Sequence, residues 1–158
     1  MFISPRNTGI LLIILSIIAI VIGIIFIYQG WSKNNLIVER MRVEKVQLAL
    51  DPNKPADLTN ITNAFDAQKA ADIIASHRRA IAPSYQDLLG NGRFDPNNPQ
   101  HLTYAQAMNL ENYLYLAVTA FGLIYVTIGA GIFMVVVGIG MLFISLVFMK
   151  LTVKIPAA

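Results

Sequence analysis

The densest group of polar side chains in the sequence is formed by His77, Arg78 and Arg79. The guanidinium of arginine is planar and always charged, and its fork of N–H donors matches carboxylates and phosphates. One interpretation is therefore a contact site for an anion or a lipid head group. The other is a solvated helix face whose arginines form salt bridges with the nearby Asp72 or Asp87. The second interpretation requires no ligand and is the one we favour.

Other residues that could support chemistry are few. The two histidines, His77 and His101, lie in different predicted elements, which disfavours a shared metal or haem. The chain has no cysteine, which removes disulfides and thiolate metal sites. No nucleophile, zinc-protease or phosphate-loop motif occurs. We therefore predict no catalytic residue, no metal, no cofactor and no enzymatic activity.

The composition indicates a membrane protein. Hydrophobic residues make up 56% of the chain and charged residues 13%, whereas a soluble domain has about 25% charged residues. All acidic residues lie between Glu39 and Glu111, while Arg6, Lys150 and Lys154 stand alone on the two tails. The net charge of +3 thus belongs to the tails. With no basic stripe, the sequence predicts no nucleic-acid partner.

The first apolar stretch predicts a transmembrane helix over residues 10–31, after a tail of residues 1–9. Ile10–Ile27 is apolar apart from one serine, and about 20 such residues cross a hydrocarbon core of ~30 Å. Tyr28 and Trp31 follow where an interfacial aromatic belt is expected. A cleaved signal peptide is the alternative, but this apolar region is too long and no small-residue cleavage site follows it.

The second apolar stretch, residues 112–149, is uncharged and longer than one span needs. Two short spans joined near Gly129–Gly131 would explain the length, but that turn would have no polar residue. We predict instead one helix of ~70 Å over residues 104–150, with its membrane part at about 125–149 and a tail at 151–158. Its surplus, Tyr113–Ile124, would need protein to cover it.

Both spans carry small residues at steps of three, four and seven, which place them on one helix face. Small residues let helix backbones approach closely in lipid. The predicted seam consists of Ser16, Ala19 and Gly23 in the first span and Thr127, Gly131, Gly138 and Ser145 in the second. It would pair the two helices within one chain or pair the chain with a partner.

Residues 32–103 form a polar and mostly helical insert. The pattern over Ser32–Leu50 predicts that the first helix continues with one apolar face, although the alternation of Val46, Leu48 and Leu50 allows a short strand. Further along, helices are expected from near Asn60 or Thr62 to about Ala82, and over 84–89 before Gly90. Residues 91–100 are a loop, and a capping box at Thr103 and Gln106 predicts that the long helix begins at Tyr104. Glu111 and Asn112, at the start of the apolar stretch, are expected to meet a partner or a lipid head group.

The predicted fold is an all-α integral membrane protein with two transmembrane helices flanking a helical insert, the C-terminal helix being unusually long. Because the tails carry only positive charge, we expect cytoplasmic termini and an extracytoplasmic insert in the cell membrane. Lys33, Arg40 and nearby cations oppose this orientation, but acids accompany them and long loops translocate largely regardless of charge.

These features predict a non-catalytic accessory or structural subunit of a larger membrane protein complex. Its partners would be other membrane subunits and the lipid bilayer. The absence of charge from both spans argues against a pump acting alone. Two alternatives stay open: a self-assembling homo-oligomeric scaffold or pore, and a membrane-anchored binding or sensor module that uses residues 77–79.

Overall fold

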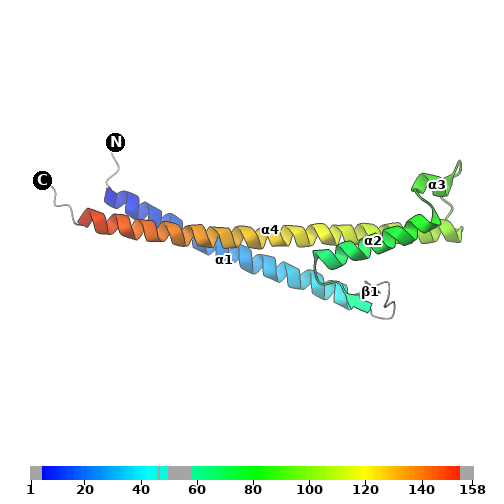
Figure 1. The fold of residues 1–158 in the computed structure, drawn as a ribbon, viewed down its shortest axis with the longest axis horizontal. Helices are drawn as coiled ribbons and strands as arrows, with labels where there is room; N and C mark the ends of the chain where they lie inside the picture. Colours follow the sequence, from blue (N-terminus) through cyan, green and yellow to red (C-terminus); the bar gives the residue numbers. More distant parts are fainter. Residues whose placement is uncertain (1–4, 46, 50–57, 154–158) are drawn as a thin grey trace. The chain divides into compact units, whose positions relative to one another are not determined.

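A computed structural model describes residues 5–45, 47–49 and 58–153. The described elements are α1 (Pro5–Val43), β1 (Gln47–Ala49), β2 (Leu58–Asn60), α2 (Ala64–Ile81), α3 (Tyr85–Leu89) and α4 (Pro99–Val153) (Figure 1). They belong to two compact units. The hairpin unit holds Met1–Lys33 and Ile124–Ala158, and the insert unit holds Asn34–Leu123.

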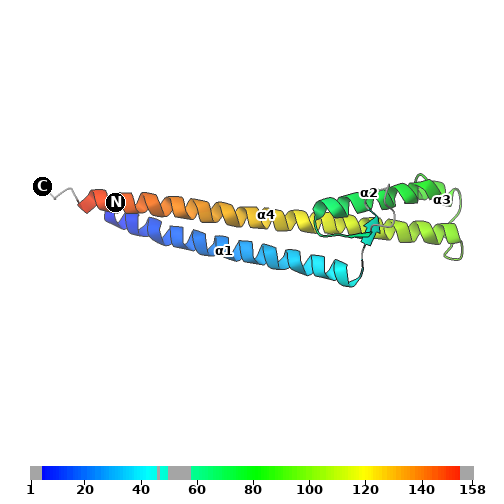
Figure 2. The same cartoon turned by 60° about the horizontal axis from the view of Figure 1, so that its bottom comes forward.

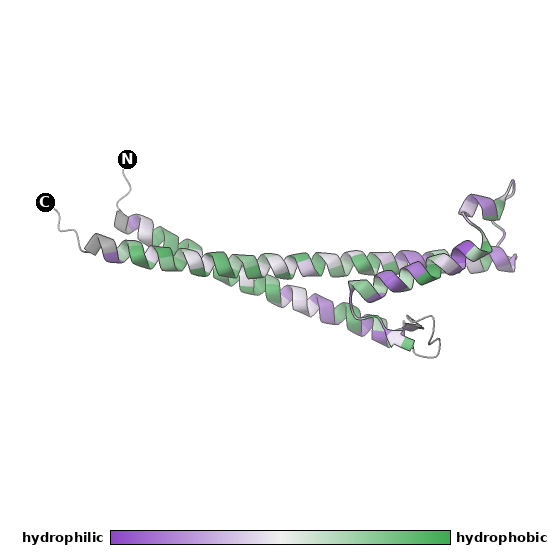
Figure 3. Cartoon of the chain, in the orientation of Figure 1, coloured by the Kyte–Doolittle hydropathy of each residue, from purple (hydrophilic) through white to green (hydrophobic). Residues whose placement is uncertain are grey.

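Two of the helices, α1 and α4, are long and apolar enough to cross a membrane by length and composition. Figure 3 shows hydrophobic residues along most of both helices in the hairpin unit. Helix α4 runs through Gly129–Gly131 without a turn and has 55 residues. The prediction of one long helix is therefore confirmed, and the alternative of two short spans is wrong.

In the hairpin unit, α1 and α4 run antiparallel and side by side (Figures 1 and 2). The side of each helix that faces the other is buried at every seventh residue. The buried positions are Gly9, Ser16, Gly23 and Gly30 in α1, and Ile124, Gly131, Gly138 and Ser145 in α4. A repeat of seven keeps one stripe of an α-helix facing its neighbour over several turns.

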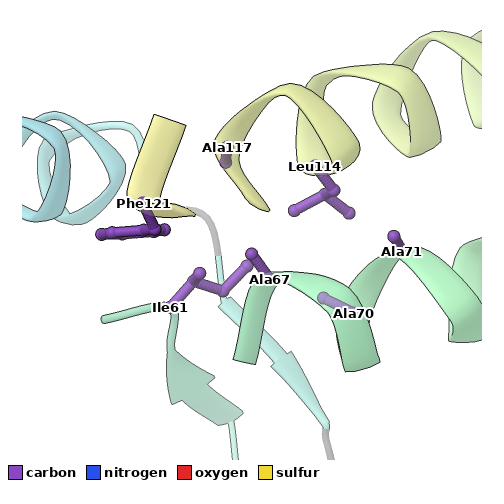
Figure 4. Close-up of a cluster of buried hydrophobic side chains, with 7 residues drawn as sticks. All are labelled: Ile61, Ala67, Ala70, Ala71, Leu114, Ala117 and Phe121. Atoms are coloured by element: carbon purple, nitrogen blue, oxygen red, sulfur yellow. The ribbon is translucent and has the colours of Figure 1, made fainter. Parts of the chain in front are cut away.

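The core of the insert unit lies between α2 and α4 (Figure 4). From α2 it receives alanines, whose small side chains allow the two helices to approach closely. From α4 it receives the larger Leu114 and Phe121 together with Ala117. Its buried members are Ile61, Ala67, Ala70, Ala71, Leu114, Ala117 and Phe121. Ile37, Val38 and Met41 of α1 pack against this cluster. The predicted extension at 113–124 is thus covered on one face by the chain itself.

Helix α1 ends earlier than predicted. It stops at Val43 instead of continuing to Leu50, and Lys45 has a φ of 50°, which no α-helix accommodates. The strand alternative is confirmed over Gln47–Ala49, which pairs antiparallel with β2. The remaining predicted strand positions, 46 and 50, lie outside the described residues. The fold is therefore mostly helical with one small ribbon.

Capping residues set the boundaries of α2 and α3. Helix α2 begins just after Asn63, whose side chain accepts a hydrogen bond from the backbone N–H of Asp66 at 2.9 Å. Of the two predicted starts, Asn60 is wrong because it lies in β2, whereas Thr62 lies one residue before the cap. The predicted end at about Ala82 is confirmed, as is the short helix α3 between Ser84 and Gly90.

The predicted start of α4 at Tyr104 is also wrong, because the helix begins at Pro99. Asn98 caps it by accepting a hydrogen bond from the backbone N–H of Gln100 at 2.9 Å. Proline suits the first helical position, where its missing N–H has no helical partner. Thr103 lies inside the helix and donates to the carbonyl of Pro99 at 2.8 Å, so it is not a cap. The end, predicted at Lys150, lies at Val153.

Candidate functional site

The most buried charged contact in the described residues joins α2 to α4 in the insert unit. Arg78 Nε donates to Glu111 Oε2 at 2.6 Å, and Arg78 Nη2 donates to Glu111 Oε1 at 3.4 Å. The two side chains are only 12% and 11% exposed. Arg78 Nη1 also donates to the hydroxyl of Tyr104, which is fully buried. The fork of Arg78 is therefore occupied by groups of the same chain.

The hydrogen bond with Glu111 raises the pKa of Arg78 above its ordinary value. The guanidinium also lies 5.0 Å from the centroid of the Tyr104 ring. Aromatic contact and a paired carboxylate both favour the charged form. The side chain therefore stays cationic at any physiological pH, and its charge is balanced locally.

This ion pair corrects the partners expected for Arg78. Asp72 accepts from Gln68 and from the hydroxyl of Tyr115, both at 3.0 Å. Asp87 accepts from the hydroxyl of its neighbour Ser84 at 2.6 Å. The expected salt bridges from Arg78 to these two acids are therefore wrong.

The three residues of the predicted anion contact do not form one site. Consecutive positions on an α-helix point about 100° apart, and His77 and Arg79 are exposed while Arg78 is held by α4. Glu111, expected to meet a partner or a lipid head group, instead meets Arg78. The sequence held a clue to this pairing. Glu111 is the only Asp, Glu, Lys or Arg between Pro99 and Met149, and it lies seven residues from Tyr104 on the same helix face.

His101 has a local role in the loop before α4. Its Nδ1 accepts a hydrogen bond from the backbone N–H of Asp95 at 3.0 Å, and its ring stacks on Phe94 with 5.7 Å between centroids. These contacts close the loop onto the first turn of the helix. Within 5–45, 47–49 and 58–153, no three His, Asp or Glu residues are grouped as metal ligands would be.

The seam of the hairpin unit brings two glycines into backbone contact. A Cβ built on Gly23 would lie 2.6 Å from the carbonyl oxygen of Gly131, and a Cβ built on Gly131 would lie 2.7 Å from the carbonyl oxygen of Gly23. Real Cβ atoms do not come so close to backbone. Any larger residue at either position would therefore push the helices apart.

Each of these glycines also receives a large side chain from the opposite helix. Ile27 lies against Gly131 and Val135 lies against Gly23, at 2.9 and 2.8 Å from the corresponding built Cβ atoms. The same arrangement places Ile20 against Gly138, at 2.7 Å. Large and small residues thus alternate along both faces, which increases the van der Waals contact between the two helices.

The two serines of the predicted seam are both fully buried. Ser145 Oγ donates to the carbonyl of Gly9 at 2.7 Å across the seam, and Ser16 Oγ donates to Leu12 of its own helix at 2.6 Å. Ala19 and Thr127 are half-buried and lie beside the stripe of sevens. Of the two uses left open by the sequence, this structure shows the seam inside one chain.

Comparison with protein-family models, curated proteins and solved structures found no match for this chain.

Proposed function

We propose that this chain is a non-catalytic membrane subunit whose α1–α4 hairpin crosses the bilayer and whose insert serves a larger membrane assembly. The observation that carries the proposal is the length of the seam. It runs from Gly9 to Gly30 in α1 and from Ile124 to Ser145 in α4, which at 1.5 Å per residue is ~31 Å. The hydrocarbon core of a bilayer has a thickness of ~30 Å.

The outward surface of the hairpin supports a lipid environment. The most apolar windows of α1 and α4 are each only 11% buried, whereas the core helix of a soluble protein is mostly buried. Exposed residues of these windows include Ile14, Ile24, Phe133 and Val136. In water such a continuous apolar surface would drive association. In lipid it needs no further cover.

The role of α1 in the hairpin argues against a cleaved signal peptide. Gly131 and Gly138 of α4 lie against backbone and side chains of α1. Removal of α1 would leave this face of α4 without its matching surface. A permanent anchor explains why residues near the N-terminus complement residues more than a hundred positions later.

The two ends of the seam differ in a way that suits the proposed orientation. Tyr28, Trp31 and Tyr125 are exposed near one end, where aromatic side chains suit the membrane interface. Arg6 and Lys150 lie near the other end. Positive charge favours the cytoplasmic side, so the proposal has both termini in the cytoplasm and residues 34–123 outside.

The accessory role is supported by contacts that side chains make within the chain. The arginine best suited to bind an external anion is held by Glu111 and Tyr104, so the sensor alternative loses its central residue. The glycine seam is used within the chain. Binding to other subunits is therefore assigned to the outward faces of the hairpin and of the insert.

Extraction in mild detergent, followed by native mass measurement, tests the accessory role. We expect the chain to leave the membrane together with at least one different polypeptide in fixed proportion. A dispersed monomer, or a particle containing only copies of this chain, would contradict the accessory role. The Gly131→Leu variant, which opens the seam, is expected to lose the co-purifying polypeptide. The Gly129→Leu variant adds the same side chain on the open face of α4, where it changes contact with lipid but not the packing of the hairpin. A comparison of the two variants therefore separates the effect of hairpin packing from that of lipid contact.

A further inference from the structure

In the insert unit, α4 carries an uncharged stripe on a face that the core does not use. Its members are spaced by four, three, four, three and four residues, and they are Leu102, Gln106, Asn109, Tyr113, Leu116 and Ala120. We refer to these residues as the 102–120 stripe. Alternating steps of three and four are the spacing by which two helices pair along their length.

The 102–120 stripe contains large apolar side chains in exposed positions. Tyr113 is 69% exposed and Leu116 is 63% exposed, while their neighbour Leu114 is 2% exposed in the core. Tyr113 lies seven residues from Gln106 and Leu116 seven from Asn109, so apolar and amide residues share one face. A face of this kind is more favourable when covered by another helix than when left in water.

Charge does not oppose self-association along this helix. Glu111 is the only Asp, Glu, Lys or Arg between Pro99 and Met149, and Arg78 neutralises it within the chain. Two α4 helices can therefore approach along the stripe without like-charge repulsion.

The stripe is also complementary to itself. The side-chain amides of Gln106 and Asn109 each carry both donors and an acceptor, so each can pair with the same amide of another copy. Two copies inserted with the same orientation have parallel α4 helices, which brings identical residues to the same level. This common orientation, and the confinement of both copies to one bilayer, rest on the proposed membrane function.

We propose that a second copy of this chain covers the 102–120 stripe, so that two α4 helices pair in parallel and in register through it. Confinement to one bilayer raises the effective concentration of the two helices. A stripe of fewer than three heptads is then sufficient, although it would be marginal between free helices in water. The pair is the unit that joins any larger assembly.

Single-cysteine crosslinking in native membranes tests the proposal, because the natural chain has no cysteine. Leu116→Cys places a thiol on the stripe, and Asn109→Cys provides a second reporter seven residues away. Thr119→Cys is the matched control, since Thr119 is an exposed residue of the same helix that lies off the stripe. A disulfide needs Cβ atoms about 3.5–4.5 Å apart, so mild oxidation should give disulfide-linked dimers for both stripe variants at a several-fold higher yield than for Thr119→Cys.

Three results would overturn the proposal. They are equal dimer yields for stripe and control variants, no dimer from either stripe variant, and an adduct between Leu116→Cys and a different polypeptide. The last result would assign the stripe to another subunit and would support the accessory role. Stripe-specific dimers in a particle without any other polypeptide would support the pairing and contradict the accessory role. Helical circular dichroism equal to that of the natural chain confirms that each variant is folded.

Discussion

Arg78 and Glu111 form the more buried of the two ion pairs in the described part of the chain. Both are nearly buried, and each satisfies the other. When one partner of such a pair is removed, the remaining charge is left in a poorly solvated position. The Glu39–Arg42 pair offers a comparison, because its side chains are 54% and 66% exposed to water.

Replacement of Glu111 by glutamine is expected to weaken the insert unit by about 2–4 kcal/mol. Glutamine keeps the shape and one acceptor but leaves the charge of Arg78 unbalanced. The measurement is amide hydrogen exchange of α2, whose packing on α4 the pair supports. Glu39→Gln is the matched control and should leave this exchange unchanged, because exposed pairs contribute little. Equal exchange in both variants would show that the buried pair does not hold α2 in place.

A second prediction concerns pH and Tyr115. The hydrogen bond that its hydroxyl donates to Asp72 raises the pKa of Tyr115 above 10.0, with burial as a smaller cause. The protonated phenol is the form that bonds, so its contribution to stability is complete below pH 10 and is lost as the pH rises through the raised pKa. Asp72→Asn should move the pKa of Tyr115 back toward 10.0. Ring-carbon NMR of labelled tyrosine measures the shift, and Asp87→Asn, in α3, should not move it.

Little of the residue-scale detail was predictable from the sequence. The cluster at 77–79 attracted attention because its charges are adjacent, yet Arg78 forms a buried ion pair while His77 and Arg79 are exposed. Its partner lies 33 residues away on another helix, and local spacing carries no information about such a pairing. The isolation of Glu111 in the otherwise uncharged stretch of residues 99–149 was the one usable clue.

At the scale of elements, the hairpin depends on where its glycines point. Gly131 faces the backbone of α1, whereas Gly129, two residues earlier, has open space around the position of a Cβ. The pair provides a test of the seam within one turn of the same helix.

Gly131→Ala is expected to destabilise the hairpin by about 1–3 kcal/mol, because the added methyl meets backbone that cannot move aside. Gly129→Ala should be neutral or stabilising by up to about 1 kcal/mol, since alanine is the better helix former. Reversible unfolding in mixed detergent micelles, followed by circular dichroism, measures the difference. Equal stabilities for the two variants would mean that α1 and α4 do not meet at Gly131.

The helices themselves were largely predictable, and their ends were predictable only where a local residue sets them. Pro83 ends α2 and Gly90 ends α3 because backbone geometry at these positions is decided locally. The start of α4 was missed because Thr103–Gln106 has the spacing of a capping box, while the actual cap is Asn98 before Pro99. The end of α1 was missed because its amphipathic pattern continues past Val43 into a strand.

At the scale of the whole molecule, the testable quantity is orientation. Ser76 is an exposed residue of α2, and Asn7 is an exposed residue near the start of α1. A membrane-impermeant thiol reagent applied to intact cells should label Ser76→Cys. It should label Asn7→Cys only after the membrane is opened. The reverse pattern would place the insert in the cytoplasm, and labelling of both variants in intact cells would contradict two membrane crossings.

The division into two units explains which large-scale features the sequence revealed. A change in composition separates apolar spans from a polar insert, so two long apolar helices were predictable. The partner of each seam glycine was not predictable, because the repeat of seven in α1 fits several registers on α4. The sizes of the side chains across the seam select one of these registers. The packing of Phe121 with α2 could not be predicted from the sequence either, because alanine-rich helices have no strongly apolar stripe.

The separation of the two halves of the seam also has a consequence for biosynthesis. Gly30 leaves the ribosome roughly 90 residues before Ile124, an interval of about 5–20 s at ordinary rates of translation. During that interval a chain inserted as proposed holds α1 in the bilayer with its glycine face turned to lipid. Any factor that guards newly inserted helices therefore meets α1 before α4, and the hairpin closes only after α4 has been made.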